Sequence, residues 1–188
     1  METQEIYNIL QKDPKTRMSC GGVLPSDQLP PKPDSRDLDH DIYFVINLDP
    51  STKPGSHWVV CYFRNNNIKP LYFDSYGFPP TIDSIKDFVG EDYEHNTRAV
   101  QHPLSTSCGQ WCIFFVYHQI YKNEMGKNVK TFKQRFSKSD LLKNDHEINH
   151  WINTVFGVEN KVIERDFLCN QISQSKLAVS EKFDYLYD

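Results

Sequence analysis

Three short apolar runs stand close together in the first half of this 188-residue chain. They cover 42–48, 57–63 and 70–74, and their β-branched and aromatic residues are typical of strands. The asparagine-rich segment 64–67 tolerates left-handed backbone, so it predicts a turn between the second run and the third. We therefore expect an antiparallel hairpin within a sheet, with a further edge strand at 97–101.

Apolar residues at helical spacing predict helices around these strands. The stretch 111–121 is apolar at most positions, which favours a central helix buried on most of its circumference. Turn-forming residues fill 18–41 and predict a long irregular connection. The other expected helices are a short one at 3–11 before Pro14, one at 82–89 ended near Gly90, one that begins at 139–142, and one at 145–156 stopped by Gly157.

Length and composition favour a single intracellular domain. We expect this domain over 1–188, with 158–188 as a polar C-terminal extension. The polar start and the lack of an apolar run of about 20 residues argue against secretion and against a membrane span. A net charge of -4 provides no overall attraction for nucleic acid. Five cysteines, an odd number at irregular spacing, predict reduced thiols.

Cys108 has the sequence context of an activated thiol. A cysteine attacks a carbonyl as a thiolate, and a cation or a helix N-terminus must lower its ordinary pKa of about 8.5 for that. Cys108 follows a polar loop and opens the apolar helix, so the positive end of the helix dipole points at its sulfur. The adjacent Gly109 leaves room for an extended substrate. Taken alone, a cysteine is more often a buried small hydrophobe, but this loop–helix junction favours a nucleophile.

His57 and Asp74 supply the partners that such a thiol needs. His57 opens the second strand run and Asp74 ends the third, so an antiparallel hairpin would place both at the same rim of the sheet. We expect His57 to be the base and Asp74 to orient it. Gln101 can supply a side-chain amide that, with the Cys108 backbone N–H, stabilises an oxyanion. Each residue has an ordinary structural interpretation, but their coincidence favours catalysis.

These residues carry a family resemblance, which is clearest between Asp41 and Tyr121. The pattern is Gly55-x-His57-Trp58, then Tyr72-x-Asp74-x-x-Gly77-Phe78, then Gln101-(six residues)-Cys108-Gly109-x-x-Cys112. It resembles adenain, the adenovirus maturation protease, and its relatives in Maverick/Polinton elements and virophages. The resemblance implies an α+β fold, papain-like or adenain-like, in which helices flank a mixed central sheet.

The same resemblance implies a function. It suggests a cysteine endopeptidase that cuts beside small residues, often glycine, in capsid or core precursor proteins during particle maturation. It places the protein in the virion or in the nucleus or cytoplasm of a host cell, and we expect a monomer without membrane association. Cys112 lies one helical turn from Cys108, but the chain has no second pair at zinc spacing, so we expect no metal and no other cofactor.

Activation by a partner is left open. The adenovirus enzyme is activated by a disulfide-linked peptide, and no cysteine stands at the matching place between Gly90 and Gln101, so the same linkage is not expected here. DNA is a cofactor of that relative. The candidate DNA contacts in this chain, which a solvated helix face explains as well, are Lys122, Lys127, Lys130, Lys133, Arg135 and Lys138.

Two other functions compete with a maturation protease. A SUMO- or ubiquitin-like deconjugating isopeptidase shares the order His, Asp, Gln, Cys, but such enzymes usually carry Asp directly before the Cys-Gly pair, where this chain has Ser107. A non-catalytic assembly protein that retains the fold would leave Cys108 unreactive. The complete set of four candidate residues argues against that second alternative.

Overall fold

The structure is a computed structural model that describes residues 1–66, 68–121 and 136–157. The basic run Lys122 to Arg135 and the extension 158–188 with Cys169 lie outside these residues, so the expectations for them stay predictions. In chain order the elements are α1 (Thr3–Gln11), α2 (Pro14–Met18), β1 (Cys20–Pro25), β2 (Ile42–Asn47), β3 (Trp58–Arg64), β4 (Ile68–Asp74), α3 (Asp83–Val89), β5 (Glu94–His95), α4 (Cys108–Ile120) and α7 (Leu141–Phe156).

One five-stranded sheet runs in the order β1-β2-β3-β4-β5. The central strands β2, β3 and β4 are antiparallel, whereas β1 pairs with β2 and β5 pairs with β4 in parallel. The expected mixed sheet and the β3–β4 hairpin are therefore confirmed. In the hairpin register Val59 lies opposite Asp74, which brings the last residue of β4 next to the start of β3.

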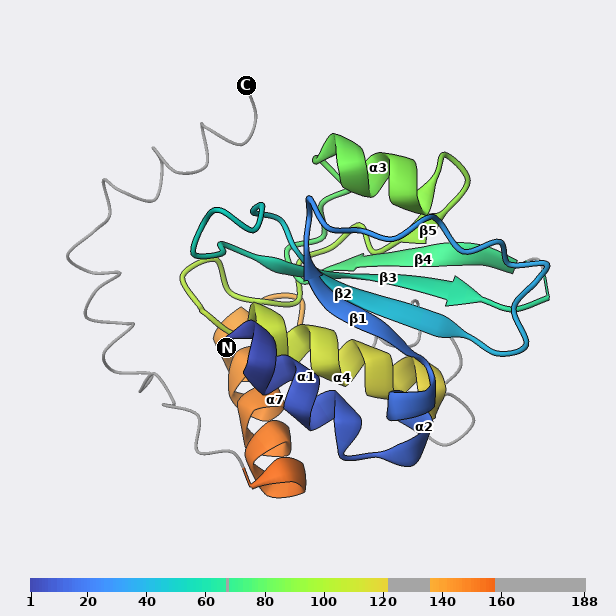
Figure 1. Cartoon of the computed structure of the whole chain (residues 1–188). Coiled ribbons are helices and arrows are strands. Elements are labelled where there is room, and N and C mark those ends of the chain that lie inside the picture. Colours follow the sequence, from blue (N-terminus) through green and yellow to red (C-terminus); the bar gives the residue numbers. More distant parts are fainter. Residues whose placement is uncertain (67, 122–135, 158–188) are drawn as a thin grey trace. The chain divides into compact units, whose positions relative to one another are not determined.

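Helices cover both faces of the sheet, with α3 on one face and α1, α4 and α7 on the other (Figure 1). Successive strand residues point to opposite faces. Tyr43 and Val45 of β2 thus pack with α1 and α4. Phe44 and Ile46 pack with α3. Burial on both faces explains why the strands read as continuous apolar runs rather than as alternating ones.

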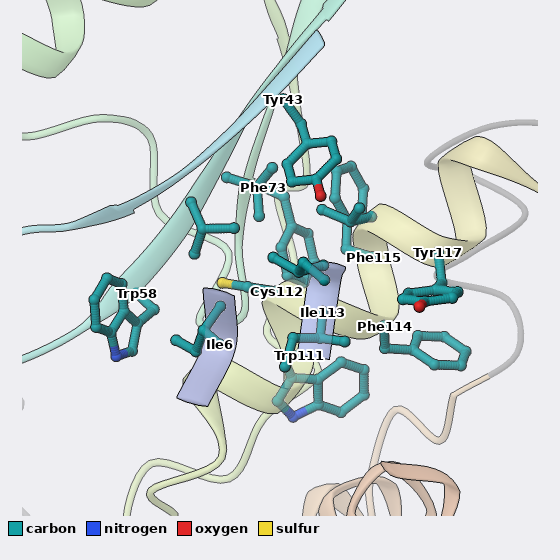
Figure 2. Close-up of a cluster of buried hydrophobic side chains, with 14 of the residues drawn as sticks. Ile6, Tyr43, Trp58, Phe73, Trp111, Cys112, Ile113, Phe114, Phe115 and Tyr117 are labelled. Carbon is teal, nitrogen blue, oxygen red and sulfur yellow. The ribbon is translucent and has the colours of Figure 1, made fainter. Parts of the chain in front are cut away.

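Helix α4 is buried along almost its whole length, as its apolar sequence predicts. Figure 2 shows its side chains packed against those of the sheet, with Phe115 next to Phe73 of β4. These two rings are stacked, with their centroids 4.4 Å apart and an angle of 5° between their planes. The stack joins the strand that ends at Asp74 to the helix that begins at Cys108. No helix among the described residues is long and apolar enough to cross a lipid bilayer.

The segment expected to be wholly irregular, 18–41, contains strand β1 at its start. Only Val23 of this edge strand is buried, so no apolar run marks it. Gly21 leaves room for the Phe44 ring, which a Cβ at that position would overlap. Pro14 has a second role that the sequence analysis missed, because it stands in the first turn of α2. The Asp13 carboxylate caps this helix by accepting hydrogen bonds from the N–H groups of Lys15 and Thr16.

Two further expectations were wrong. The segment 97–101 is not a strand, because the N–H groups of Val100 and Gln101 both donate to the Ser75 carbonyl and turn the chain across the end of β4. The edge strand is instead the two-residue β5. The two helices expected at 139–142 and 145–156 are one continuous helix, α7. It begins after Asp140, whose carboxylate accepts from the Lys143 N–H, and it ends at Gly157 in the left-handed conformation, as expected.

Candidate active site

His57 and Asp74 meet at one rim of the sheet, where β3 begins and β4 ends. The imidazole Nε2 lies 2.9 Å from Asp74 Oδ1, and both side chains are largely withdrawn from solvent. A hydrogen bond of this kind fixes the orientation and the tautomer of the ring, and it leaves Nδ1 free to face another group. The hairpin register supplies this arrangement directly, because Asp74 is opposite the second residue of β3.

Asp74 is itself held by the chain around it. Its Oδ1 also accepts a hydrogen bond of 2.8 Å from the Tyr76 N–H. The fully buried Asn96 accepts from the Asp74 backbone N–H at 3.0 Å and donates to the Asp74 carbonyl oxygen. Asn96, in the loop after β5, thus fixes the end of β4 through two hydrogen bonds. Sequence reasoning missed it, since an isolated asparagine in a loop carries no spacing signal.

Cys108 is the first residue of α4, and its thiol is a hydrogen-bond partner of the His57 imidazole. Burial works to raise the pKa of the Cys108 thiol, but the hydrogen bond and charge of His57, with the Trp58 backbone N–H, hold that pKa below its ordinary value. Burial works to lower the pKa of His57, but its hydrogen bonds to Asp74 and Cys108 and their charges raise it. The two shifts together favour a thiolate–imidazolium pair.

Cys112 provides an internal comparison for this shift. It lies one turn further along α4, points into the core (Figure 2) and is fully buried. Burial raises the pKa of the Cys112 thiol well above its ordinary value, and the charge of Cys108 raises it further. The packing role expected for Cys112 agrees with this environment. Position at the helix N-terminus and contact with His57 therefore distinguish Cys108 from its neighbour.

Gln101 lies in a buried hydrogen-bond network. Its Oε1 accepts a bond of 2.5 Å from Ser75 Oγ. Its Nε2 donates to the Ser105 carbonyl at 2.9 Å and lies 3.3 Å from the Tyr76 hydroxyl. Gln101 is thus linked to Tyr76 and to the loop 102–107 that leads to Cys108.

Tyr76 is a second residue of the site, after Asn96, that the sequence did not single out. Its ring stacks on the His57 imidazole, with centroids 4.7 Å apart and planes 24° apart. Burial raises the pKa of the Tyr76 phenol, and the negative charge of Cys108 raises it further. An aromatic face over a cationic imidazole is stabilising. The signal was available, because Tyr76 stands inside the quoted element that runs from Asp74 to Gly77.

The turn after β4 needs Gly77. Its φ is +83°, which is a conformation that residues with a side chain rarely adopt. A Cβ at this position would also lie 2.6 Å from the backbone of Arg98. The close approach brings the segment that leads to Gln101 against the turn that carries Tyr76. In the described ranges no group of three or more His, Cys, Asp or Glu side chains is arranged to hold a metal ion.

No protein-family model matches the chain. It is similar to proteins named "Protease" from three adenoviruses. The identity is 26% over 141 residues with ovine adenovirus D serotype 7 (66% of this chain and 66% of that protein), 28% over 105 residues with snake adenovirus serotype 1 (45% and 51%), and 24% over 123 residues with bovine adenovirus 4 (51% and 59%). The matches thus span from about half to about two thirds of these relatives.

Two solved structures are also similar. One is the ASFV protease, with a TM-score of 0.48 and 16% identity over 78% of this chain and 64% of that chain. The other is the SUMO protease Ulp1, with a TM-score of 0.33 and 20% identity over 56% and 53%. The matches to the adenovirus proteins confirm the resemblance to adenain-like cysteine proteases that the sequence pattern indicated.

Proposed function

We propose that this chain is a cysteine endopeptidase in which Cys108 is the nucleophile, His57 the base, Asp74 the group that orients the base, and Gln101 an oxyanion donor. The observation that carries the proposal is the series Asp74–His57–Cys108, in which Asp74 and His57 are buried and Cys108 is partly exposed at the N-terminus of α4. The similarity to adenovirus proteins named "Protease" supports the reaction type. Their partial coverage makes the activity of this chain a matter for experiment.

The reaction would proceed in two halves. The Cys108 thiolate attacks the scissile carbonyl carbon, and the Cys108 backbone N–H and the Gln101 amide stabilise the oxyanion that forms. The imidazolium of His57 then protonates the leaving amine as the C–N bond breaks, which leaves a thioester. In the second half His57 takes a proton from water, the resulting hydroxide attacks the thioester, and the carboxylic acid leaves as the thiolate is restored.

The proposed substrates are protein precursors cut beside small residues such as glycine. Support comes from the resemblance to the adenovirus maturation enzyme. The adjacent Gly109 does not add to it, because a Cβ there would meet Ile6 and Met1 at 3.1 Å rather than open space. Capsid or core precursors of a virus or virus-like element are the specific class that we propose. A role inside an infected cell or a virion follows from the same reasoning.

Alkylation by iodoacetamide across pH tests the thiol directly, because the reagent needs no substrate recognition. We expect Cys108 to label selectively below the pKa of free cysteine, with the label located by mass spectrometry. The variant Cys108→Ala should lose this label, and His57→Ala should return the labelling midpoint toward that of an ordinary thiol. Partly exposed Cys20 is the internal control, since burial raises the pKa of its thiol.

Substrate class is tested next with two reagents, a glycine-containing precursor peptide and a ubiquitin-like conjugate. Cleavage of the peptide alone supports a maturation endopeptidase, and cleavage of the conjugate alone would identify a deconjugating isopeptidase. If Cys108 labels no faster than Cys20, with or without added DNA and capsid peptides, the fold serves binding rather than catalysis and the proposal fails.

A further inference from the structure

We infer that Asp145 is a positioning residue that fixes the loop 102–107 and so sets the oxyanion side of the site, an inference that rests on the proposed function. Asp145 belongs to α7, which contributes none of the four candidate catalytic residues. Its side chain is nevertheless buried directly behind the loop that joins Gln101 to Cys108.

Two N–H donors from two other parts of the chain converge on the Asp145 carboxylate. Oδ2 accepts from the His102 backbone N–H at 2.9 Å, and Oδ1 accepts from Trp111 Nε1 at 2.7 Å. The Ser105 hydroxyl is a further hydrogen-bond partner. One carboxylate therefore ties α7 to the loop and to α4 at once. A neutral side chain of the same size cannot accept from both N–H donors in this way, because an amide replaces one acceptor by a donor.

The link from Asp145 to the oxyanion donor passes through Ser105. The Ser105 carbonyl accepts the 2.9 Å hydrogen bond from Gln101 Nε2. The Ser105 hydroxyl accepts from the Ser107 N–H at 3.2 Å and lies 3.0 Å from Ser107 Oγ. Displacement of Ser105 would therefore move the Gln101 amide and the start of α4 together. The second group that would stabilise the oxyanion, the Cys108 N–H, follows Ser107 directly.

Neighbouring residues of α7 support the same loop with neutral side chains. Asn144 Nδ2 donates to the Val100 carbonyl at 3.1 Å. Asn149 Nδ2 donates to Ser107 Oγ at 3.1 Å. Asn144 and Asn149 stand on either side of Asp145 in the sequence of α7. They bind the chain at Val100 and at Ser107, and Asp145 binds it between these points. Asp145 is the charged member of this row, and a buried charge is costly unless it is well hydrogen bonded.

Burial works against the charge of Asp145 more strongly than its hydrogen bonds favour it. Burial raises the pKa of Asp145 to about 6, although the hydrogen bonds from Trp111, His102 and Ser105 work to lower it. The negative charge of Asp145 also helps to raise the pKa of Tyr76, so the two side chains interact electrostatically. His102 is the titratable residue of the loop 102–107, and burial lowers the pKa of its imidazole.

The inference predicts that oxyanion stabilisation can be separated from thiol activation. His57 and Asp74 activate Cys108 from the sheet side, whereas Asp145 acts from α7. Two thiol reagents report the two functions. Alkylation by iodoacetamide is a direct displacement that forms no oxyanion, whereas acylation by p-nitrophenyl acetate passes through a tetrahedral oxyanion. The ratio of the two rates at Cys108 therefore measures oxyanion stabilisation without a natural substrate.

In Asp145→Asn we expect iodoacetamide to label Cys108 within about twofold of the wild-type rate and with the same pH dependence. We expect acylation to fall about tenfold, less than the loss of a whole oxyanion donor, because the donor is displaced rather than removed. Ser105→Ala should reproduce part of this fall. The matched control is Asp140→Ala, which removes the N-cap of the same helix and should lower the melting temperature without changing the ratio.

An unchanged ratio in Asp145→Asn would overturn the inference. A parallel loss of both rates that follows the loss of folded protein would also overturn it, since that result describes a purely structural residue. Failure of the proposed function would look different. In that case the wild type would cleave no peptide, while a shifted ratio in the variant would still show that Asp145 positions the loop.

Discussion

Replacing Asp74 by asparagine removes a charge from the site with little change in shape. Asp74 Oδ1 is the atom that contacts both His57 Nε2 and the Tyr76 N–H, at 2.9 and 2.8 Å. The side-chain oxygen of asparagine can occupy the same position and keep both bonds. What changes is the strength of the bond to the imidazolium, because its acceptor is no longer ionised.

The expected size of the effect follows from this difference. Charge-assisted hydrogen bonds contribute about 1.5–3 kcal/mol and neutral ones about 0.5–1.5 kcal/mol, so the change removes about 1.5 kcal/mol of imidazolium stabilisation. Little of this is screened, since the side chain of Asp74 is only 4% exposed. The pKa of His57 should then fall by about one unit. We expect kcat/KM to fall by about tenfold on the alkaline side of the pH profile, where the variant has lost the imidazolium.

The direction of the pH effect is fixed by the raised pKa of His57. The active pair, thiolate and imidazolium, exists between the pKa of Cys108, which is lowered, and that of His57, which is raised. Asp74→Asn lowers the upper boundary, so activity is lost at lower pH on the alkaline side. The assay is kcat/KM for a fluorogenic glycine-containing peptide across pH, with thermal melting to verify folding.

Asp83→Asn is the matched control for this experiment. Asp83 is also a carboxylate with a close cationic partner, Lys86 at 2.7 Å, but it is exposed on α3. It should leave both the pH profile and the melting temperature unchanged, because exposed ion pairs contribute little. An alkaline limb that stays in place in Asp74→Asn, with a fall no larger than that of the control, would refute the assigned role of Asp74.

Two stability predictions follow from packing and from backbone conformation. Phe115→Ala should cost about 3–5 kcal/mol because it removes the fully buried ring stacked on Phe73, whereas Val155→Ala, at a residue that is 51% exposed, should change the free energy of unfolding by less than about 0.5 kcal/mol in chemical denaturation. Gly77→Ala should destabilise by more than about 2 kcal/mol and reduce peptide cleavage, since the added methyl meets backbone at 2.6 Å, whereas Gly157→Ala, with open space around it, should cost about 1 kcal/mol. Equal costs for the two alanines would contradict the packing argument at Gly77.

The parts of the fold that could be predicted from the sequence are those with a strong periodic signal. The hairpin β3–β4 and helix α4 both consist of long apolar runs, and their ends fall at His57, Asp74 and Cys108. The approach of these three residues follows from strand register and from the position of the helix start. Local patterns therefore sufficed wherever a functional residue stands at the end of a buried element.

Other features depend on contacts that no local pattern records. Strand β1 buries a single apolar residue, so its existence depends on pairing with β2. The course of 97–101 is decided by the Ser75 carbonyl, which draws two N–H groups away from strand pairing. Asn96 and Asp145 act from loops or helices remote in the chain, and a single polar residue has no spacing to detect. Tyr76 stands inside the sequence element that runs from Asp74 to Gly77, but its stacking on His57 depends on the fold.

The sequence distances between the partners of the site imply an order of assembly. His57 and Asp74 are 17 residues apart and meet through one hairpin, which closes at a small cost in chain entropy. The contact between His102 and Asp145 spans 43 residues and needs α4 and α7 to dock. During synthesis the base and its carboxylate can therefore meet before the nucleophile has been made. A chain in this state has no thiol at the site, so we expect proteolytic competence to arise only in the last stage of folding.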